Sequence, residues 1–487
     1  MGIKRYNATK DNTITNAFKA NLSTRATGSN TGLADVLETF VIYAQASTSS
    51  IEKSRILVQF DTDQMTTDRA AGLLPASGNV SYYLRMFNAA HAYSLPRNYS
   101  LEIRAVSGSW DEGRGLDLDE YSDTDTSNWI SASSTTGWVS EGGDLYATPA
   151  YSQAFGSDGS EDLEVNVSDI VEQWLAGTKP NHGLMVKISG SAESAPTTSL
   201  YTKKFFARSS EFFFKKPVIE ARFNNALKDK RGEFYYSSSL STAAENLNTI
   251  YFYNYHRGIL RNIPAIGTGK IYVSVYSGSS TADVPTGSAL TLVSDGTYVS
   301  VAAPTVATGG WVSTGVYSAS FAITAATTPI ERLYDVWFSG STQFHTGTIV
   351  PSVLTGESSA NASQFTTQIT NLKPIYHRGQ TERFRVYARP RNWSPTIYTV
   401  ATATPQSFII DSGSFRIYRI IDELDVISYG TGSTQHTALS FDSQGNYFDL
   451  DTNLLEAGYS YAIKFSYYNG SVNSYLEQPE TFKFRVE

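Results

Sequence analysis

Four aspartates crowd the segment of residues 115–125 and could together hold a metal ion. They are Asp117, Asp119, Asp123 and Asp125. Carboxylate oxygens at this density are the hard ligands that Ca²⁺ prefers. The segment lacks the glycine and the terminal glutamate of an EF-hand loop, and an acidic loop of this kind is also typical of solvated surface. It is a candidate calcium site, with solvated surface as the alternative, and we expect no other cofactor.

A second pair of acids follows a tryptophan, in the order Trp110-Asp111-Glu112. Aromatic rings beside carboxylates occur in sugar-binding sites and in glycosidases, whose mechanism needs two carboxylates on either side of one bond. Adjacent strand residues point to opposite faces, so Asp111 and Glu112 cannot flank one bond. The pattern is more typical of a packed tryptophan with a capping carboxylate, and the sequence nominates no partner acid.

Four of the 6 histidines lie in two copies of a repeated motif pair, namely His256, His345, His377 and His436. A metal or catalytic site would require the two histidines of each copy to meet across a domain. A structural role requires only a hydrogen bond to backbone beside a glycine turn, and no acid recurs near the histidines. The sequence also holds no phosphate loop, nucleophile elbow or metalloprotease helix. We therefore expect structural histidines in a protein that is not an enzyme.

Phenylalanine and lysine alternate in blocks within residues 200–223, the stretch that we expect to complete the first domain. Lysines interleaved with aromatic rings can stack on nucleic-acid bases. The net charge of -8 and the lack of a wider basic stripe favour a subunit interface and no nucleic-acid partner. The predicted interface residues are Phe205, Phe206, Phe212, Phe213, Phe214 and Lys215.

Composition narrows the class of protein further. Charged residues make up only 17% of the chain, and there are no cysteines. Disulfides and thiolate metal sites are thereby excluded. No window approaches the ~18 apolar residues of a membrane-spanning helix. The polar N-terminus has no apolar export signal, so we expect no membrane partner, synthesis in a cell's cytoplasm and release by lysis.

Period-two alternation of apolar side chains predicts an all-β chain. The clearest predicted strands are residues 38–45, 54–60, 80–87, 99–106, 183–189 and 218–223. One short helix is expected over residues 168–176, because Ser168 is a good N-cap and Gly177 follows. The long irregular region 107–163 contains three tryptophans, which favours local packing.

Residues 1–37 are polar, rich in asparagine and threonine and poor in apolar pairs. We expect an extended N-terminal arm that is ordered by a neighbouring chain, with simple disorder as the alternative.

The order of elements over about residues 38–223 resembles the DNRLRE (disaggregatase-related) domain. The resemblance is carried by SRILVQF, YYLRMF and SWDEG in the first half. LEVNVSDIVEQWLAG, PNHGL and KKFFARSSEFFFKKPVIEARF carry it in the second half. The hexapeptide that gives the family its name is absent. The resemblance implies a jelly-roll-like β-sandwich, usually non-catalytic and found on surface and carbohydrate-associated proteins, and it supplies no catalytic residues.

An internal repeat follows. Tyr255-His256-Arg257-Gly258 recurs as Tyr376-His377-Arg378-Gly379, and a second motif recurs in the same order downstream of each copy. The spacing suits one immunoglobulin-size sandwich per copy. We therefore predict an all-β chain with a jelly-roll-like sandwich and two tandem Ig-like sandwiches. Its predicted parts are the arm 1–37, the jelly roll 38–225 and the Ig-like domains 226–372 and 373–487.

The opening IKRYNATKDNTITNAF and the KKFFARSSEFFF block also resemble uncharacterised virion structural proteins of marine tailed phages. This resemblance implies a non-enzymatic capsid, neck or tail component, located in the virion. Its partners would be other virion proteins and further copies of itself. The alternative is a carbohydrate-binding adhesin or receptor-binding fibre component that binds a surface glycan. An enzyme acting on polysaccharide is a third class.

Overall fold

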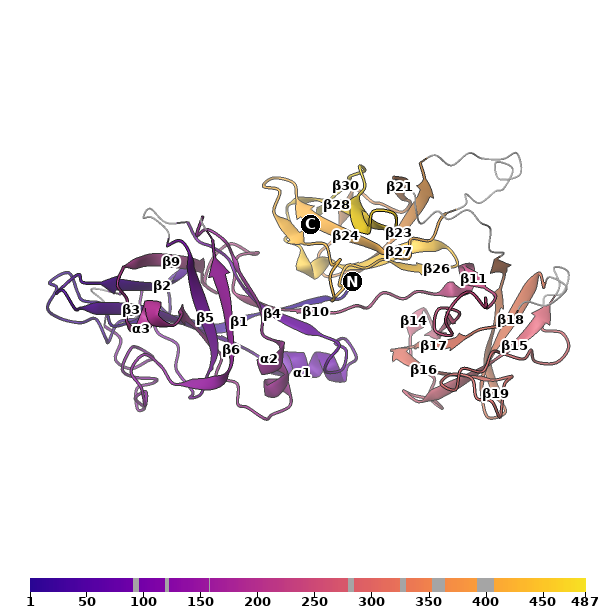
Figure 1. Ribbon diagram of the computed structural model, residues 1–487, viewed down its shortest axis with the longest axis horizontal. Coiled ribbons are helices and arrows are strands. Elements are labelled where there is room, and N and C mark those ends of the chain that lie inside the picture. Colours follow the sequence, from indigo (N-terminus) through magenta and orange to yellow (C-terminus); the bar gives the residue numbers. More distant parts are fainter. Residues whose placement is uncertain are drawn as a thin grey trace. The chain divides into compact units, whose positions relative to one another are not determined.

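The computed structural model describes residues 1–90, 96–118, 122–156, 158–278, 284–324, 330–352, 364–391 and 407–487. Over these residues the protein is all-β with a few short helices, as a jelly-roll-like sandwich followed by two Ig-like sandwiches (Figure 1). The chain divides into two compact units, residues 2–223 and residues 224–487, the second of which also includes Met1. Among the described residues no helix is both long and apolar enough to cross a membrane.

The first unit contains, within its described residues, ten strands and three short helices. The strands are β1 (Ile3–Thr15), β2 (Val36–Tyr43), β3 (Ile51–Phe60), β4 (Ser81–Met86), β5 (Tyr99–Val106), β6 (Leu145–Phe155), β7 (Leu163–Asn166), β8 (Leu184–Ile188), β9 (Leu200–Phe206) and β10 (Val218–Arg222). The helices are α1 (Asp63–Ala70), α2 (Ser168–Leu175) and α3 (Ser191–Ser194). The strands pair in the order β6-β5-β8-β3-β1-β10-β4-β7, and β2 pairs with both β3 and β9. All six predicted strands and the predicted helix are confirmed to within a few residues.

The predicted N-terminal arm is wrong, because its first half is the central strand β1. Residues 3–7 of β1 pair with β10, and residues 8–15 pair with β3, with an irregularity between Ala8 and Lys10. A strand that changes partners at a bulge turns the corner between two layers of a sandwich. The first domain therefore begins at the start of the chain rather than at residue 38 (Figure 1).

The arm was mispredicted because β1 buries polar side chains. Asp11, Asn12 and Thr13 are fully buried. Burial of such groups is tolerated only when they are hydrogen-bonded. The amide of Asn12 donates to the hydroxyl of Ser127 at 2.8 Å. Because that partner lies far along the sequence, no local apolar pattern predicts the strand.

Two hydrophobic clusters fill the first unit. The larger one gathers apolar side chains from both layers of the sandwich. The smaller one surrounds Trp110, Trp129 and Trp138, together with Ile14 of β1 and Met185 of β8. The three tryptophans thus give the part of region 107–163 that precedes β6 a core of its own, which confirms the predicted local packing. The region is not irregular throughout, because Leu145–Phe155 forms strand β6 and pairs with β5.

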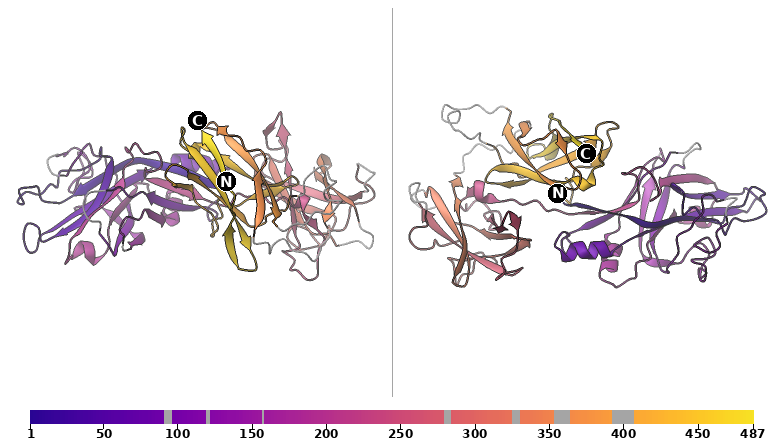
Figure 2. Two further views of the ribbon diagram at one scale, coloured as in Figure 1. Left: turned by 90° about the horizontal axis from the view of Figure 1, so that it is seen from above. Right: turned by 180° about the vertical axis from the view of Figure 1, so that it is seen from behind.

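The two longer helices lie beside strand β4 (Figures 1 and 2). Helix α2 buries Ile170, Val171 and Trp174 against the sandwich. The guanidinium of Arg69 in α1 lies 2.6 Å from the carboxylate of Glu172 in α2. This ion pair ties the two helices together and fixes the outer face of α2.

The second unit begins with a sandwich whose strands surround one hydrophobic cluster. Its elements are η1 (Lys230–Gly232), β11 (Phe234–Tyr235), β12 (Asn248–Tyr253), β13 (Tyr255–His256), β14 (Ile259–Leu260), β15 (Lys270–Gly278), β16 (Ala307–Ser313), β17 (Val316–Phe321), β18 (Arg332–Ser339), β19 (Thr342–Ile349) and β20 (Pro351–Ser352). Six of them form a sheet in the order β12-β17-β16-β15-β18-β19. Every strand of the sheet contributes to the same cluster, so the sheet curls around its core.

The last sandwich has the strand order of an immunoglobulin fold. Its elements are β21 (Phe365–Ile369), β22 (Ile375–Tyr376), β23 (Thr381–Pro390), β24 (Gly413–Arg419), β25 (Asp425–Ile427), β26 (Ser440–Asp442), β27 (Gly445–Asp451), η3 (Thr452–Leu454), β28 (Ser460–Asn469), β29 (Ser474–Glu477) and β30 (Phe482–Val486). One sheet has the order β21-β23-β27-β26 and the other β22-β30-β28-β24-β25, which correspond to A-B-E-D and A′-G-F-C-C′. The hydroxyl of Tyr461, near the start of β28, donates to the carbonyl of Glu456 at 2.7 Å. This is the tyrosine corner of such domains.

The boundary predicted at residue 372 lies too late in the chain. Strand β21 pairs with β23 and is therefore part of the last sandwich. The repeated motif also takes unequal positions. Tyr255 is 59% exposed in the hairpin of β13 and β14, whereas Tyr376 is 3% exposed in β22, which pairs with β30. The motif therefore occurs once in each Ig-like domain, but at a different structural position.

Candidate functional site

Glu112 lies in a cluster of charged side chains at one end of the first sandwich. Its carboxylate accepts two hydrogen bonds from the guanidinium of Arg208, at 2.7 and 2.5 Å, and one from the backbone N–H of Asp11 at 2.8 Å. Trp110 is buried, and its indole N–H donates to the carbonyl of His182 at 2.8 Å. Trp110 is thus packed in the interior and the carboxylate of Glu112 is hydrogen-bonded, which is the structural arrangement predicted from the sequence.

Asp11 is the acid that the sequence could not nominate as a partner of Glu112. One of its oxygens accepts the backbone N–H of Arg208 at 2.6 Å, and the other is buried without a hydrogen-bond partner among the described residues. Burial raises the pKa of Asp11 to about 7, despite the opposing effect of the Arg208 N–H. The cluster joins β1, the segment after β5 and the segment after β9.

The acidic segment 115–125 does not gather its described carboxylates into one group. Asp123 is buried, and one of its oxygens accepts the backbone N–H of Arg114 at 2.7 Å. The side chain of Asp125 is 76% exposed. No group of three potential metal-binding side chains occurs among the described residues. Asp117 is described outside any such group, and Asp119 lies outside the described residues, so calcium stays a prediction.

The aromatic-basic stretch separates into a buried part and an exposed part. Phe205, a predicted interface residue, is fully buried in the core of the sandwich, so that prediction is wrong. Its neighbour Phe206 points the other way, as alternate residues of a strand must. The ring of Phe206 packs edge-on against that of Phe212, with centroids 5.3 Å apart, and Phe212 is 51% exposed.

The remaining predicted interface residues lie at the surface of the same turn. Phe213 and Phe214 form an edge-on pair with centroids 4.9 Å apart, and both are half-buried. The ammonium group of Lys215 lies 5.5 Å from the ring centroid of Phe87. We call Phe206, Phe212, Phe213 and Phe214 the aromatic patch.

Lys203 is a buried cation that the sequence did not distinguish from its neighbour Lys204. Its ammonium group donates to the side-chain oxygen of Asn88 at 2.7 Å and to the carbonyls of Gly159 and Glu161, each at 2.8 Å. Burial lowers its pKa to about 8. Three acceptors satisfy the three ammonium hydrogens. Lys203 therefore connects β9 to the loop before β7 and does not face another molecule.

The repeat histidines do not assemble into a site. His256 is exposed in strand β13, while the ring of His345 stacks on Phe252 with centroids 5.0 Å apart. His377 is exposed, and His436 is buried with its Nδ1 3.1 Å from the hydroxyl of Thr434. The contacts described for His345 and His436 are made with the side chains of Phe252 and Thr434.

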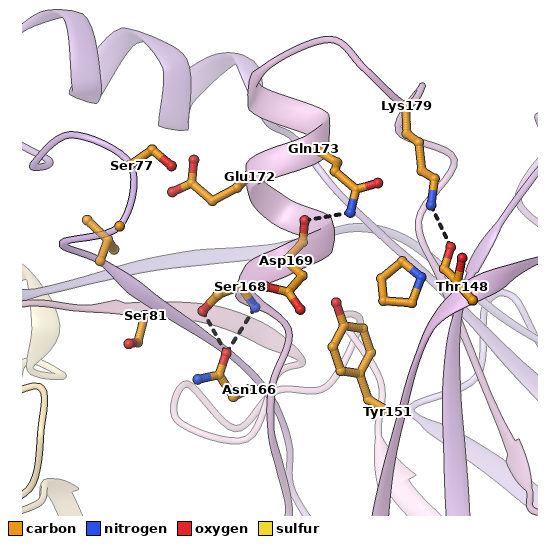
Figure 3. Close-up of a pocket in the computed structure, with 13 residues that line it drawn as sticks. Ser77, Ser81, Thr148, Tyr151, Asn166, Ser168, Asp169, Glu172, Gln173 and Lys179 are labelled. Atoms are coloured by element: carbon orange, nitrogen blue, oxygen red, sulfur yellow. Dashed lines mark hydrogen bonds between the residues drawn. The ribbon is translucent and has the colours of Figure 1, made fainter.

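A groove with a volume of about 920 Å³ lies between α2, β6 and the turn before β4 (Figure 3). Ten of its 13 lining residues carry polar side chains. Asp169, Glu172 and Gln173 border it from α2, and Thr148 and Tyr151 lie on the opposite side in β6 (Figure 3). The sequence analysis did not find this groove, because its residues come from segments that are separated along the chain.

Several groove residues are held in place by hydrogen bonds to one another. The ammonium group of Lys179 donates to the carbonyl of Thr148 at 2.5 Å. The hydroxyl of Tyr151 accepts the N–H of Ile170 at 3.0 Å. The hydroxyl and backbone N–H of Ser168 both donate to the side-chain oxygen of Asn166, at 2.6 and 3.0 Å. These bonds fix both walls of the groove.

Comparisons with known proteins give a fold likeness only. No protein-family model matches the chain, and no curated protein matches it. Among solved structures, the N-terminal Ig1-2 module of the Drosophila receptor protein tyrosine phosphatase DLAR is 7% identical, covering 50% of this chain and 91% of that one, with a TM-score of 0.14. A marsupial T cell receptor is 10% identical, covering 50% and 69%, with a TM-score of 0.16. The Ig-like assignment therefore rests on the strand order described above.

The described residues thus present two kinds of feature. Glu112 with Arg208, and Lys203 with its three acceptors, connect segments within the first unit. The aromatic patch and the polar groove, in contrast, have groups that face solvent. These two surfaces are our candidates for contact with another molecule.

Proposed function

We propose that the protein is a structural component of a tailed-phage virion, without catalytic activity. It would be made in the host cytoplasm and carried out of the cell within the particle. The observation that supports this role is that titratable groups gathered by the fold serve as ion pairs between strands or between the segments that follow them. Glu220 of β10 lies 2.7 Å from Arg5 of β1, and Glu112 binds Arg208. Groups used in this way stabilise a scaffold.

The aromatic patch supplies the contact that assembly needs. Exposed aromatic side chains that cluster at a surface are typical of protein interfaces. Phe212 is 51% exposed, and its neighbours in the patch are partly covered. We propose that this patch contacts another copy of the chain or a neighbouring virion protein. The resemblance to DNRLRE domains, which are usually non-catalytic, agrees with such a role.

Mass spectrometry of purified virions tests the proposal. We expect this chain in many copies per particle, and gold-labelled antibody to it on particles in electron micrographs. Recovery of the chain only from the soluble lysate, as a monomer that releases reducing ends from polysaccharide, would overturn the assignment. A monomer without turnover that is absent from particles would also overturn it.

A further inference from the structure

The groove lies where the two end strands of the first sheet approach each other. Strands β6 and β7 stand at opposite ends of the strand order. The side chain of Gln153 in β6 bridges them, because it donates to the carbonyl of Asp162 at 2.8 Å and accepts the N–H of Glu164 at 2.7 Å. Tyr151 of β6 and Asn166 of β7 lie beyond this bridge and line the groove. The two end strands are thus joined through Gln153, and the groove lies beside this bridge.

The open part of the seam presents a mixture of hydroxyl, amide and carboxylate groups. The carboxylate of Asp169 is exposed and makes no hydrogen bond to any residue that the structure describes. Gln173, Asn166 and Ser81 add amide and hydroxyl groups around it. Side chains of these types both donate and accept hydrogen bonds, which matches a ligand rich in hydroxyl groups. The rings of Tyr151 and Pro149 add apolar surface within the same groove.

The charges of the groove are largely balanced. Glu172 is paired with Arg69, and Lys179 is occupied by the carbonyl of Thr148 while its ammonium group lies 4.8 Å from the ring centroid of Tyr146. Asp169 and Lys179 are the remaining charges among the lining residues, one of each sign. These two opposite charges sum to zero, so the lining has no net charge to attract a strongly anionic ligand, and the balance favours a neutral ligand.

An extended peptide added to the edge of β6 fits the groove less well. Strand addition requires free backbone N–H and C=O groups along the edge. Pro149 has no N–H, and the carbonyl of Thr148 already accepts a hydrogen bond from Lys179. The stretch of β6 that lines the groove therefore offers few backbone groups for a peptide strand.

We propose that the groove between α2 and β6 binds a segment of a neutral oligosaccharide. Asp169 and Gln173 accept hydrogen bonds from sugar hydroxyls, and Tyr151 packs against the apolar face of a sugar ring. The site is independent of the aromatic patch, so the protein can bind a glycan whether or not it is assembled in a particle.

A printed array of neutral and acidic microbial glycans, probed with the full-length protein, tests the proposal. Hits are then measured by calorimetry with the corresponding free oligosaccharide. We expect binding to neutral glycans, and we expect Asp169→Ala to weaken it by about tenfold, as loss of a hydrogen bond to a charged group does. Gln173→Ala is a second variant, which alters a half-buried side chain and should weaken binding by a smaller factor.

Asp63→Ala is the matched control, because Asp63 is likewise an exposed acid in the first turn of an eight-residue helix. This variant should bind as tightly as the unmodified protein. Binding only to acidic glycans, binding unchanged by both groove variants, or no binding to the array would each overturn the proposal. None of these outcomes bears on whether the chain is found in virions, so the two proposals fail separately.

Discussion

The guanidinium Nε of Arg5 lies 2.7 Å from the carboxylate of Glu220, and this ion pair joins the first and last strands of the N-terminal sandwich. Glu220 is almost fully buried and also faces Arg85, at 3.3 Å, and Arg222, at 2.7 Å. Burial alone would raise the pKa of Glu220, but the three guanidinium groups outweigh it and hold the pKa well below its usual range. One carboxylate thus connects β1, β10 and β4.

Replacing Glu220 by alanine should destabilise the first sandwich strongly. The substitution leaves three arginines without their shared partner, and breaking a buried ion pair in this way costs about 3–5 kcal/mol. Chemical denaturation followed by tryptophan fluorescence measures the change. Glu211→Ala removes an exposed glutamate before the same strand and should change the free energy of unfolding by less than about 0.5 kcal/mol. Equal losses in the two variants would contradict the role of Glu220.

Asp11 should make the stability of the first sandwich depend on pH. Its pKa is raised from 3.8 to about 7 in the folded state, so the folded protein holds a proton that the unfolded chain releases. The free energy of unfolding should therefore fall as pH rises from about 4 to about 7, and level off above that. Asp11→Asn cannot ionise and should remove this slope. Urea denaturation of both proteins at several pH values tests the difference, and parallel profiles would count against it.

The last sandwich should fold by itself when it begins before β21. A fragment of residues 364–487 retains the pairing of β21 with β23, whereas residues 373–487 lose that edge of one sheet. We expect the longer fragment to melt cooperatively and at a higher temperature than the shorter one. Circular dichroism during heating measures both. Indistinguishable melting of the two fragments would show that β21 contributes nothing to the domain.

Phe212 should matter for association but not for folding. Phe212→Asp places a charge in the aromatic patch and should reduce self-association or incorporation into particles, while the melting temperature stays the same. Tyr201→Asp is the control, because Tyr201 is 53% exposed and lies outside the patch, in strand β9. Light scattering of the purified proteins and mass spectrometry of particles provide the measurements. Normal assembly by the Phe212 variant would show that the aromatic patch is not part of the interface.

Chelation should distinguish the two interpretations of the acidic segment. Asp123 already accepts hydrogen bonds from Arg114 and Asn30, so we expect EGTA to leave the melting temperature of the first sandwich unchanged. A fall in melting temperature on chelation, abolished by Asp119→Ala, would instead establish a calcium site. Differential scanning calorimetry with and without added Ca²⁺ measures the effect.

Local patterns predicted the apolar strands well. Residues 54–60 and 99–106 alternate apolar and polar side chains, and both are strands of the first sandwich. The helix predicted at 168–176 forms over Ser168–Leu175 with the expected apolar face buried. The predicted cap is wrong, because Val167 takes the N-cap position and the hydroxyl of Ser168 donates to the side-chain oxygen of Asn166 instead. In each case the signal lies within a few residues of the element that it predicts.

The failures at β1, at Phe205 and at the groove involve partners that lie far apart in sequence. β1 is a strand because Asn12 and Asp11 find hydrogen-bond partners in segments about a hundred residues away, and no local pattern encodes that. Phe205 and Phe206 are identical in type, but the register of β9 with β2 buries only the first. The groove depends on α2 and β6 meeting, which the sequence does not reveal. Local sequence patterns therefore do not predict a site that is built from distant segments of the chain.

The dual pairing of β1 also has a consequence for how the chain is made. Residues 3–7 pair with β10, which ends at Arg222. This part of β1 therefore stays unpaired until the ribosome has made almost the whole domain. At about 5–20 residues per second this wait lasts roughly 10–40 s. A ribosome that stalls before residue 222 would hold a sandwich with an open seam, which exposes strand edges to aggregation. This topology is therefore best served by uninterrupted translation, or by a chaperone that covers β1 until β10 has been made.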